Sequence, residues 1–161
     1  MVTISRILVP IDFSPCSAAA LDHAQFLAAL VDASIDILHV IRQPTYVGAE
    51  VMVDVSGKSR QSFKDFARAQ AEREMSRFLA SRTDSPKLTR HMQVGDPTRM
   101  ILEFALENRC DLLVMGTNGR TGFSHLLLGS VTEKVVRRSP CPVLIVRDAT
   151  CKSEPSESHE Q

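Results

Sequence analysis

A glycine-rich loop, set between an apolar run and a helical pattern, is the segment that most constrains the fold of this chain. The apolar run, residues 111–115, is short and bounded by turn residues, which is typical of a buried strand. The loop then contains four glycines within fourteen residues: Gly116, Gly119, Gly122 and Gly129. A strand, a glycine-rich loop and a helix together present backbone N–H groups and a helix N-terminus to an anion. The loop therefore predicts a phosphate cradle for a nucleotide, although the same glycines also suit a merely flexible connection.

Two better-known phosphate-binding loops are excluded by the spacing. A Walker A loop needs a Lys before its Ser or Thr, and residues 116–129 contain no Lys. The dinucleotide fingerprint Gly-x-Gly-x-x-Gly is absent as well. Its first two glycines are one residue apart, whereas here two residues lie between Gly116 and Gly119 and two between Gly119 and Gly122. What remains is Gly116-x2-Gly119-x9-Gly129-Ser130, a spacing that resembles the nucleotide-binding signature of the universal stress protein family, in its ATP-binding branch.

Composition argues against several other classes of protein. With 19 basic and 19 acidic side chains, no long basic run, one Tyr and no Trp, the chain gives little support for nucleic-acid binding. No apolar run approaches the length of a membrane span, and the first residues show no secretory signal, so a cytoplasmic protein is expected. The four cysteines form no Cys-x-x-Cys pair, which argues against a zinc or redox motif. Cys110 and Cys141 are expected to act as small hydrophobic residues, and Cys151 is a candidate exposed thiol.

Apolar runs and helical patterns alternate along the chain. Five runs predict strands: residues 4–11, 35–41, 88–94, 111–115 and 142–146. Four patterns predict helices: one from Pro15, one over about 60–81, one from Pro97 and one over 130–138. Ser14 and Asp96 are expected N-caps, each followed by a first-turn Pro, and Ser130 is expected to cap the last helix.

The helical repeat also predicts which side chains are buried. In the first helix the apolar stripe consists of Ala18, Leu21, Phe26, Leu27 and Leu30. In the last helix Val131, Val135 and Val136 share one side. His39 is expected to be a hydrogen-bonded core histidine, because it lies in a strand that should be buried. Residues 42–59 lack a clean period and are expected to form an irregular segment, either a functional lid or a mobile loop.

Strands that alternate with helices predict an α/β fold with a parallel sheet. Right-handed crossovers then place helices on both faces of that sheet. If the first three strands wind outward and the fourth returns beside the first, the strand order is 3-2-1-4-5. Ligands bind beyond the carboxyl ends of such strands where the order reverses, which brings residues 10–13 and the glycine loop to one cleft. The prediction is a single Rossmann-like domain over residues 1–147, followed by a disordered tail over 148–161.

The resemblance to the universal stress protein family extends well beyond the glycine loop. Four further segments resemble motifs of that family: residues 9–14, 38–40, 94–97 and 139–146. Together the matching segments cover about residues 3–147, and their combination is far more specific than any one of them. By this resemblance, ATP would be held by ten residues: Pro10, Asp12, Val40, Gly116, Gly119, Arg120, Gly129, Ser130, Val131 and Thr132.

The resemblance also implies a role for each part of this site. Pro10 and Asp12 would line the adenosine pocket, and the backbone of Val40 would meet the adenine edge. The other residues would wrap the phosphates, which Mg²⁺ would bridge. Some of these side chains have a second explanation. Asp12 would also support a helix start, and Arg120 would equally be a solvated loop residue. His125, in the same loop, is expected to be a solvated surface residue in preference to a general base.

Three functions remain open from the sequence. The first is an ATP-binding regulator in the stress response, with Mg²⁺ held through the phosphates and no protein-built metal site. The second is a slow Mg²⁺-dependent ATP hydrolase, with weak turnover because the loop has neither a Walker lysine nor a clear catalytic base. The third is an interaction protein that binds another adenine nucleotide, such as AMP or cyclic AMP. In each case the apolar last strand, Val143–Val146, would lie at a sheet edge, which predicts a homodimer through this strand.

Overall fold

The computed structural model describes residues 3–42, 52–55, 59–80, 82, 87–117 and 128–147. The predicted tail over residues 148–161 therefore lies outside the described residues, as do Gly119, Arg120, His125 and Cys151. Within the described part of the chain, no helix combines the length and the hydropathy that crossing a membrane requires.

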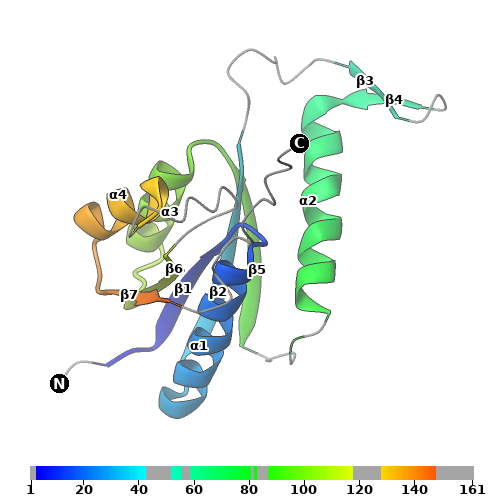
Figure 1. The fold of residues 1–161 in the computed structure, drawn as a ribbon. Coiled ribbons are helices and arrows are strands. Elements are labelled where there is room, and N and C mark those ends of the chain that lie inside the picture. The colour runs from blue at the N-terminus through cyan, green and yellow to red at the C-terminus, as the bar shows by residue number, and fades with distance from the viewer. Residues whose placement is uncertain are drawn as a thin grey trace, which may run out of the picture.

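Five parallel strands form the central sheet of the molecule (Figure 1). They are β1 (Arg6–Ile11), β2 (Ser34–Ile41), β5 (Leu88–Val94), β6 (Leu112–Gly116) and β7 (Val143–Val146). Their spatial order is β5-β2-β1-β6-β7, which is 3-2-1-4-5 when the sheet strands are counted along the chain. The predicted fold class and strand order are therefore confirmed. The order reverses at β1, where Ile7 lies opposite Ile35 of β2 on one side and Leu112 of β6 on the other.

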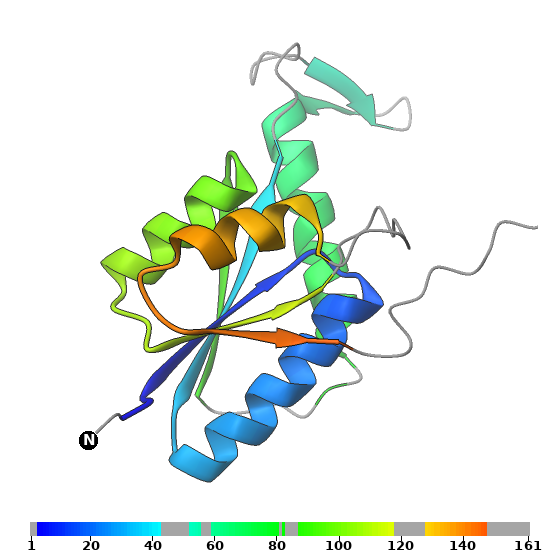
Figure 2. The same ribbon diagram turned by 60° about the vertical axis from the view of Figure 1, so that its left-hand side comes forward.

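Helices cover both faces of the sheet, as predicted (Figure 2). One face carries α1 (Pro15–Val31) and α2 (Phe63–Leu79), and the other carries α3 (Pro97–Glu107) and α4 (Ser130–Arg138). Side chains alternate along β1, so Ile7 and Val9 join the core under α1 and α2, whereas Leu8 joins the core under α3 and α4. All three are fully buried, because helices on both sides leave neither face of the parallel sheet to solvent.

Side chains cap the first turns of three helices. Ser14, Ser62 and Asp96 each accept a hydrogen bond from the backbone N–H three residues later, at the starts of α1, α2 and α3. The predicted caps Ser14 and Asp96 are thereby confirmed. The prediction that Ser130 caps α4 is wrong, because Gly129 is the extended N-cap residue and Ser130 already belongs to the helix. Gly129 has no side chain with which to cap α4.

An antiparallel hairpin precedes α2. It consists of β3 (Met52–Val55) and β4 (Ser59–Ser62), and it lies at the N-terminal end of α2, away from the central sheet (Figure 1). The prediction of irregular structure throughout 42–59 is therefore wrong for the residues in these strands. The predicted helix start near Arg60 is wrong as well, because Arg60 lies in β4 and the Ser62 hydroxyl caps a helix that begins one residue later.

The buried face of α1 differs from the predicted stripe. Phe26 and Leu30 are 64% and 67% exposed, so their prediction as buried residues is wrong. At about 100° per residue, they lie roughly 140° and 180° around the helix from Leu21, which is fully buried. The helix packs on the sheet through Leu21 and small residues that include Ala20, Ala24 and Ala28. In α4, Val136 is likewise exposed, whereas Val135 is buried as predicted.

A polar cluster lies between the sheet and α3. The buried Asp36 carboxylate accepts hydrogen bonds from Arg6 Nε at 2.6 Å and from His91 Nε2 at 2.7 Å. The hydrogen bond to Asp36 raises the pKa of the Arg6 guanidinium above its usual range. Burial raises the pKa of the Cys110 thiol to about 11, so this residue stays uncharged in the core, as predicted for a small hydrophobic residue. Arg6 and Asp36 lie near the amino ends of β1 and β2. Their ion pair is therefore at the opposite end of the sheet from the carboxyl ends of the strands.

The orientation of α1 can be tested with two leucines of the same helix. Leu21→Ala should lower the free energy of unfolding by about 2–5 kcal/mol, because it removes fully buried atoms. Leu30→Ala should change it by less than about 0.5 kcal/mol, because Leu30 is largely exposed. Urea unfolding followed by circular dichroism gives both values. Equal losses in the two variants would contradict the orientation described above.

Candidate functional site

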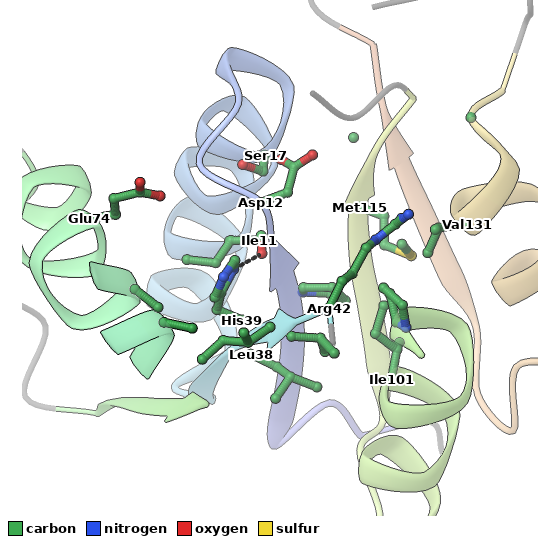
Figure 3. A pocket seen from close by; sticks show the side chains of 18 of the residues that line it. Ile11, Asp12, Ser17, Leu38, His39, Arg42, Glu74, Ile101, Met115 and Val131 are labelled. Carbon is green, nitrogen blue, oxygen red and sulfur yellow. Dashed lines mark hydrogen bonds between the residues drawn. The ribbon is translucent and has the colours of Figure 1, made fainter. Parts of the chain in front are cut away.

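A cavity of about 590 Å³ opens at the carboxyl ends of β1, β2 and β6, beside the reversal of strand order (Figure 3). The strand ends form its floor, the first turns of α3 and α4 form one side, and the inner face of α2 forms the opposite side. Open α/β sheets bind their ligands at this position. The volume also lies in the usual range for small-molecule sites.

Eight of the ten residues predicted for the site line this one cavity. They are Pro10, Asp12, Val40, Gly116, Gly129, Ser130, Val131 and Thr132. The remaining two, Gly119 and Arg120, lie outside the described residues. The structure thus brings the segment after β1 to the segments after β6 and at the start of α4, as the switch-point argument predicted, and adds the end of β2. The role of these residues in binding stays a prediction.

Gly116 is the point at which β6 meets the first turn of α1. A Cβ atom at this position would lie 2.8 Å from the backbone of Cys16, closer than real Cβ contacts. Two hydrogen bonds then tie the start of α4 to the same strand end. The Thr132 hydroxyl donates to the Gly116 carbonyl at 3.2 Å, and the Gly129 N–H donates to the Thr117 carbonyl at 2.7 Å. The two helix starts and the strand end therefore form one continuous wall.

Asp12 both supports a helix start and lines the cavity. Its carboxylate accepts hydrogen bonds from the Ser14 N–H at 3.1 Å and from the Ser14 hydroxyl at 2.6 Å. The Ser14 hydroxyl oxygen in turn accepts the Ser17 N–H, so Asp12 holds the capping residue of α1 in place. Figure 3 shows Asp12 and Ser17 close together at one rim of the cavity. The two explanations that the sequence left open for Asp12 are therefore compatible.

His39 is the hydrogen-bonded core histidine that the sequence predicted. It is 9% exposed, and its Nδ1 lies 2.9 Å from the Ile11 carbonyl (Figure 3). Because a carbonyl oxygen only accepts, this nitrogen carries the hydrogen. The ring also packs on Phe13, with the two centroids 4.3 Å apart. His39 lines the cavity from this fixed position.

Two parts of the cavity wall were not predicted from the sequence. The inner face of α2 contributes Phe66, Gln70 and Glu74, with the Gln70 amide donating to the Glu74 carboxylate at 3.3 Å. Their spacing of four residues indicated a single helix face, but that pattern equally fits packing against a core. Arg42, which directly follows β2, is the second part. No pattern in the sequence singled it out.

The first turn of α4 faces the cavity, and its N-cap residue, Gly129, has no side chain to cap it. Gly129, Ser130, Val131 and Thr132 all line the cavity, and the first hydrogen bond that closes a turn of α4 runs from the Glu133 N–H to the Gly129 carbonyl. The N–H groups that precede it have no partner within a helix. Together with the positive end of the helix dipole, such groups favour an anion.

The fold and the site define a class: a doubly wound α/β protein with a ligand-sized cavity at the switch point and a helix N-terminus open to it. The sequence profile described as "Universal stress protein family" matches residues 3–147. The chain therefore belongs to the universal stress protein family, as the resemblance implied.

Individual relatives agree with this assignment. The chain is 35% identical to universal stress protein YxiE of Bacillus subtilis over 153 residues, covering 89% of this chain and 99% of that protein. The solved structure of protein MJ0577, from Methanocaldococcus jannaschii, superposes with a TM-score of 0.71 at 28% identity, over 91% of this chain and 98% of that one. A universal stress protein solved in complex with cAMP superposes with a TM-score of 0.56 at 28% identity, over 88% and 96%.

The contact at Gly116 can be tested by adding one methyl group. Gly116→Ala should lower the free energy of unfolding by about 1–3 kcal/mol, because the new Cβ meets the Cys16 backbone rather than a flexible side chain. Gly129→Ala is the matched control, since Gly129 has an extended conformation that any residue adopts, and it should cost less than about 1 kcal/mol. Chemical denaturation measures both. A Gly116→Ala protein as stable as the wild type would contradict the close approach of α1 and β6.

Proposed function

We propose that this universal stress protein binds ATP in the cavity and acts as a nucleotide-dependent regulator in the stress response, with little or no hydrolysis. The observation that carries the proposal is the convergence of the eight described site residues on one cavity at the switch point. The solved complex of a related universal stress protein with cAMP supports an adenine nucleotide as the class of ligand.

The adenosine moiety is assigned to the side of the cavity formed by the ends of β1 and β2. Pro10 and Val40 line this side, and the apolar side chains of Ile101 and Met115 are also exposed to the cavity. Apolar walls suit the faces of a purine, and the backbone of Val40 offers polar groups for its edge. Asp12 stands at the rim, where its carboxylate is a candidate partner for a ribose hydroxyl.

The phosphates are assigned to the first turn of α4. The Thr132 hydroxyl already donates to the Gly116 carbonyl, so Thr132 would contribute its backbone N–H, while Ser130 also has its hydroxyl to offer. Among the described residues, no group of three or more acidic, His or Cys side chains could hold a metal ion. The proposal therefore places Mg²⁺ on the phosphate oxygens.

Slow Mg²⁺-dependent ATP hydrolysis remains the alternative among enzymes. Hydrolysis needs a residue that positions the attacking water. The acidic side chains of the described lining, Asp12 and Glu74, already accept hydrogen bonds from Ser14 and Gln70. A second binding function, recognition of AMP or cyclic AMP, is favoured by one specific observation, the cAMP complex of the related protein.

The proposal is tested by the nucleotide content of the purified protein and by titration with ATP and Mg²⁺. Gly129→Glu should abolish binding, because it places a carboxylate where the phosphates would lie. Val136→Glu is the matched control, since it adds the same charge to the exposed face of the same helix and should leave the affinity unchanged. Chromatography of the released nucleotide, calorimetry and a phosphate-release assay give the three readouts.

Each outcome of this experiment has a distinct meaning. Recovery of unhydrolysed ATP, or tight ATP binding without phosphate release, supports the regulator. Recovery of ADP together with phosphate release supports the slow hydrolase. A preference for cAMP or AMP supports the second binding function. Unchanged ATP affinity in Gly129→Glu would contradict the assignment of the phosphates to α4.

We also propose that the protein forms a homodimer through β7. This strand lies at one edge of the sheet, and Leu144 is 36% exposed there. An apolar edge strand favours pairing with a second copy. Sedimentation at micromolar concentration should show a dimer, and Leu144→Lys should shift it toward the monomer, because charges on an edge strand oppose pairing. A wild-type monomer under these conditions would contradict the proposal.

A further inference from the structure

The cavity contains one permanently charged cation in its described lining. Arg42 is the only Lys or Arg among the described residues that line it. Its side chain extends from the end of β2 across the cavity, toward Met115 and Val131 and away from Glu74 (Figure 3). No hydrogen bond or ion pair joins the Arg42 guanidinium to another residue in the described part of the chain.

The remaining charges around the cavity leave a role for this guanidinium. Asp12 and Glu74 are acidic, and the first turn of α4 acts as about half of one positive charge. The first turn of α3 lines the cavity as well, and carboxylates in the same lining oppose the fields of both helix N-termini. A chain of phosphates carries several negative charges. Residues 116–129 contain no lysine, and their one arginine, Arg120, lies outside the described residues. Arg42 is the described residue that can balance the phosphate charges.

The chemistry and position of Arg42 suit a phosphate group. A guanidinium is planar and always charged, and it binds phosphate oxygens through two parallel N–H donors. Arg42 comes from the β2 side of the cavity, whereas Gly116, Gly129 and Ser130 come from the β6 and α4 side. An anion at the first turn of α4 would therefore be held between backbone N–H groups and the guanidinium.

We propose that Arg42 pairs with the phosphates of the bound nucleotide and is the residue that selects nucleotides over nucleosides. This inference rests on the proposed function and deepens it, because it adds a guanidinium from the end of β2 to the phosphate side that the glycine segment was predicted to form. The alternative for the same side chain is packing of the guanidinium over the purine ring. That arrangement would strengthen binding of adenosine and ATP alike, so the two arrangements are distinguished by comparing these ligands.

The test uses the full chain with three probes: ATP, adenosine and inorganic tripolyphosphate, each titrated by calorimetry in Mg²⁺-free buffer. Arg42→Met should weaken ATP and tripolyphosphate binding about tenfold or more, because a charge-assisted contact is lost. It should change adenosine binding by less than about twofold. Arg42→Lys should be intermediate for ATP, because it keeps the charge and loses the planar fork. The difference between wild type and Arg42→Met should also shrink as the salt concentration rises.

Arg138→Met is the matched control. Arg138 is exposed at the last turn of α4, opposite to the turn that faces the cavity, so its loss changes the net charge equally without touching the site. Its ligand affinities should match those of the wild type. Thermal unfolding without ligand shows whether each variant is folded. If Arg42→Met is not folded, Arg42→Lys still tests the proposal.

The outcomes separate this inference from the proposed function. Equal losses of ATP and adenosine affinity in Arg42→Met, or no loss, would overturn the phosphate role while the nucleotide site stands. A second outcome is that the wild-type protein binds tripolyphosphate but neither ATP nor adenosine, and that this binding requires Arg42. This result would overturn the adenine-nucleotide function and keep Arg42 as an anion-binding residue. A wild-type protein that binds none of the three probes would overturn both.

Discussion

The structure depends on the close approach of α1 to the end of β6. At Gly116 the two backbones leave no room for a methyl group, since a Cβ atom would lie 2.8 Å from Cys16. This approach places the loop that follows β1 directly beside the segment that follows β6, although about a hundred residues separate them in the chain. Glycine at this position serves packing between a helix and a strand. The shape of the cavity is thus set by a contact of the core and not by the loops alone.

The sequence predicted the features that follow from local chemistry. Four of the five sheet strands are largely apolar runs bounded by turn residues, and β5 is the more polar exception. Ser14 and Asp96 cap their helices because their oxygens reach the N–H three residues later. The strand order was predicted on the assumption that the first three strands wind outward and the fourth returns beside the first, and the structure confirms that order. Once the order was set, the location of the cavity followed at the reversal.

The features that the sequence did not predict depend on contacts between distant elements. The spacing of apolar residues placed Phe26 and Leu30 of α1 in the core, but the close packing of this helix buries its alanine face instead. The spacing of Gln70 and Glu74 is compatible with one helix face, but it does not indicate whether that face meets side chains or a cavity. Arg42 became a candidate only because the end of β2 and the first turn of α4 line the same cavity.

The open N-terminus of α4 has a consequence for how the site is coupled to the rest of the protein. A helix of nine residues is marginal on its own, and Gly129 supplies no side chain to complete its first turn. An anion bound there takes over the hydrogen bonds that a cap would otherwise provide. Occupancy of the cavity and local stability of α4 are then one linked equilibrium, in which the ligand serves as the missing end of the helix.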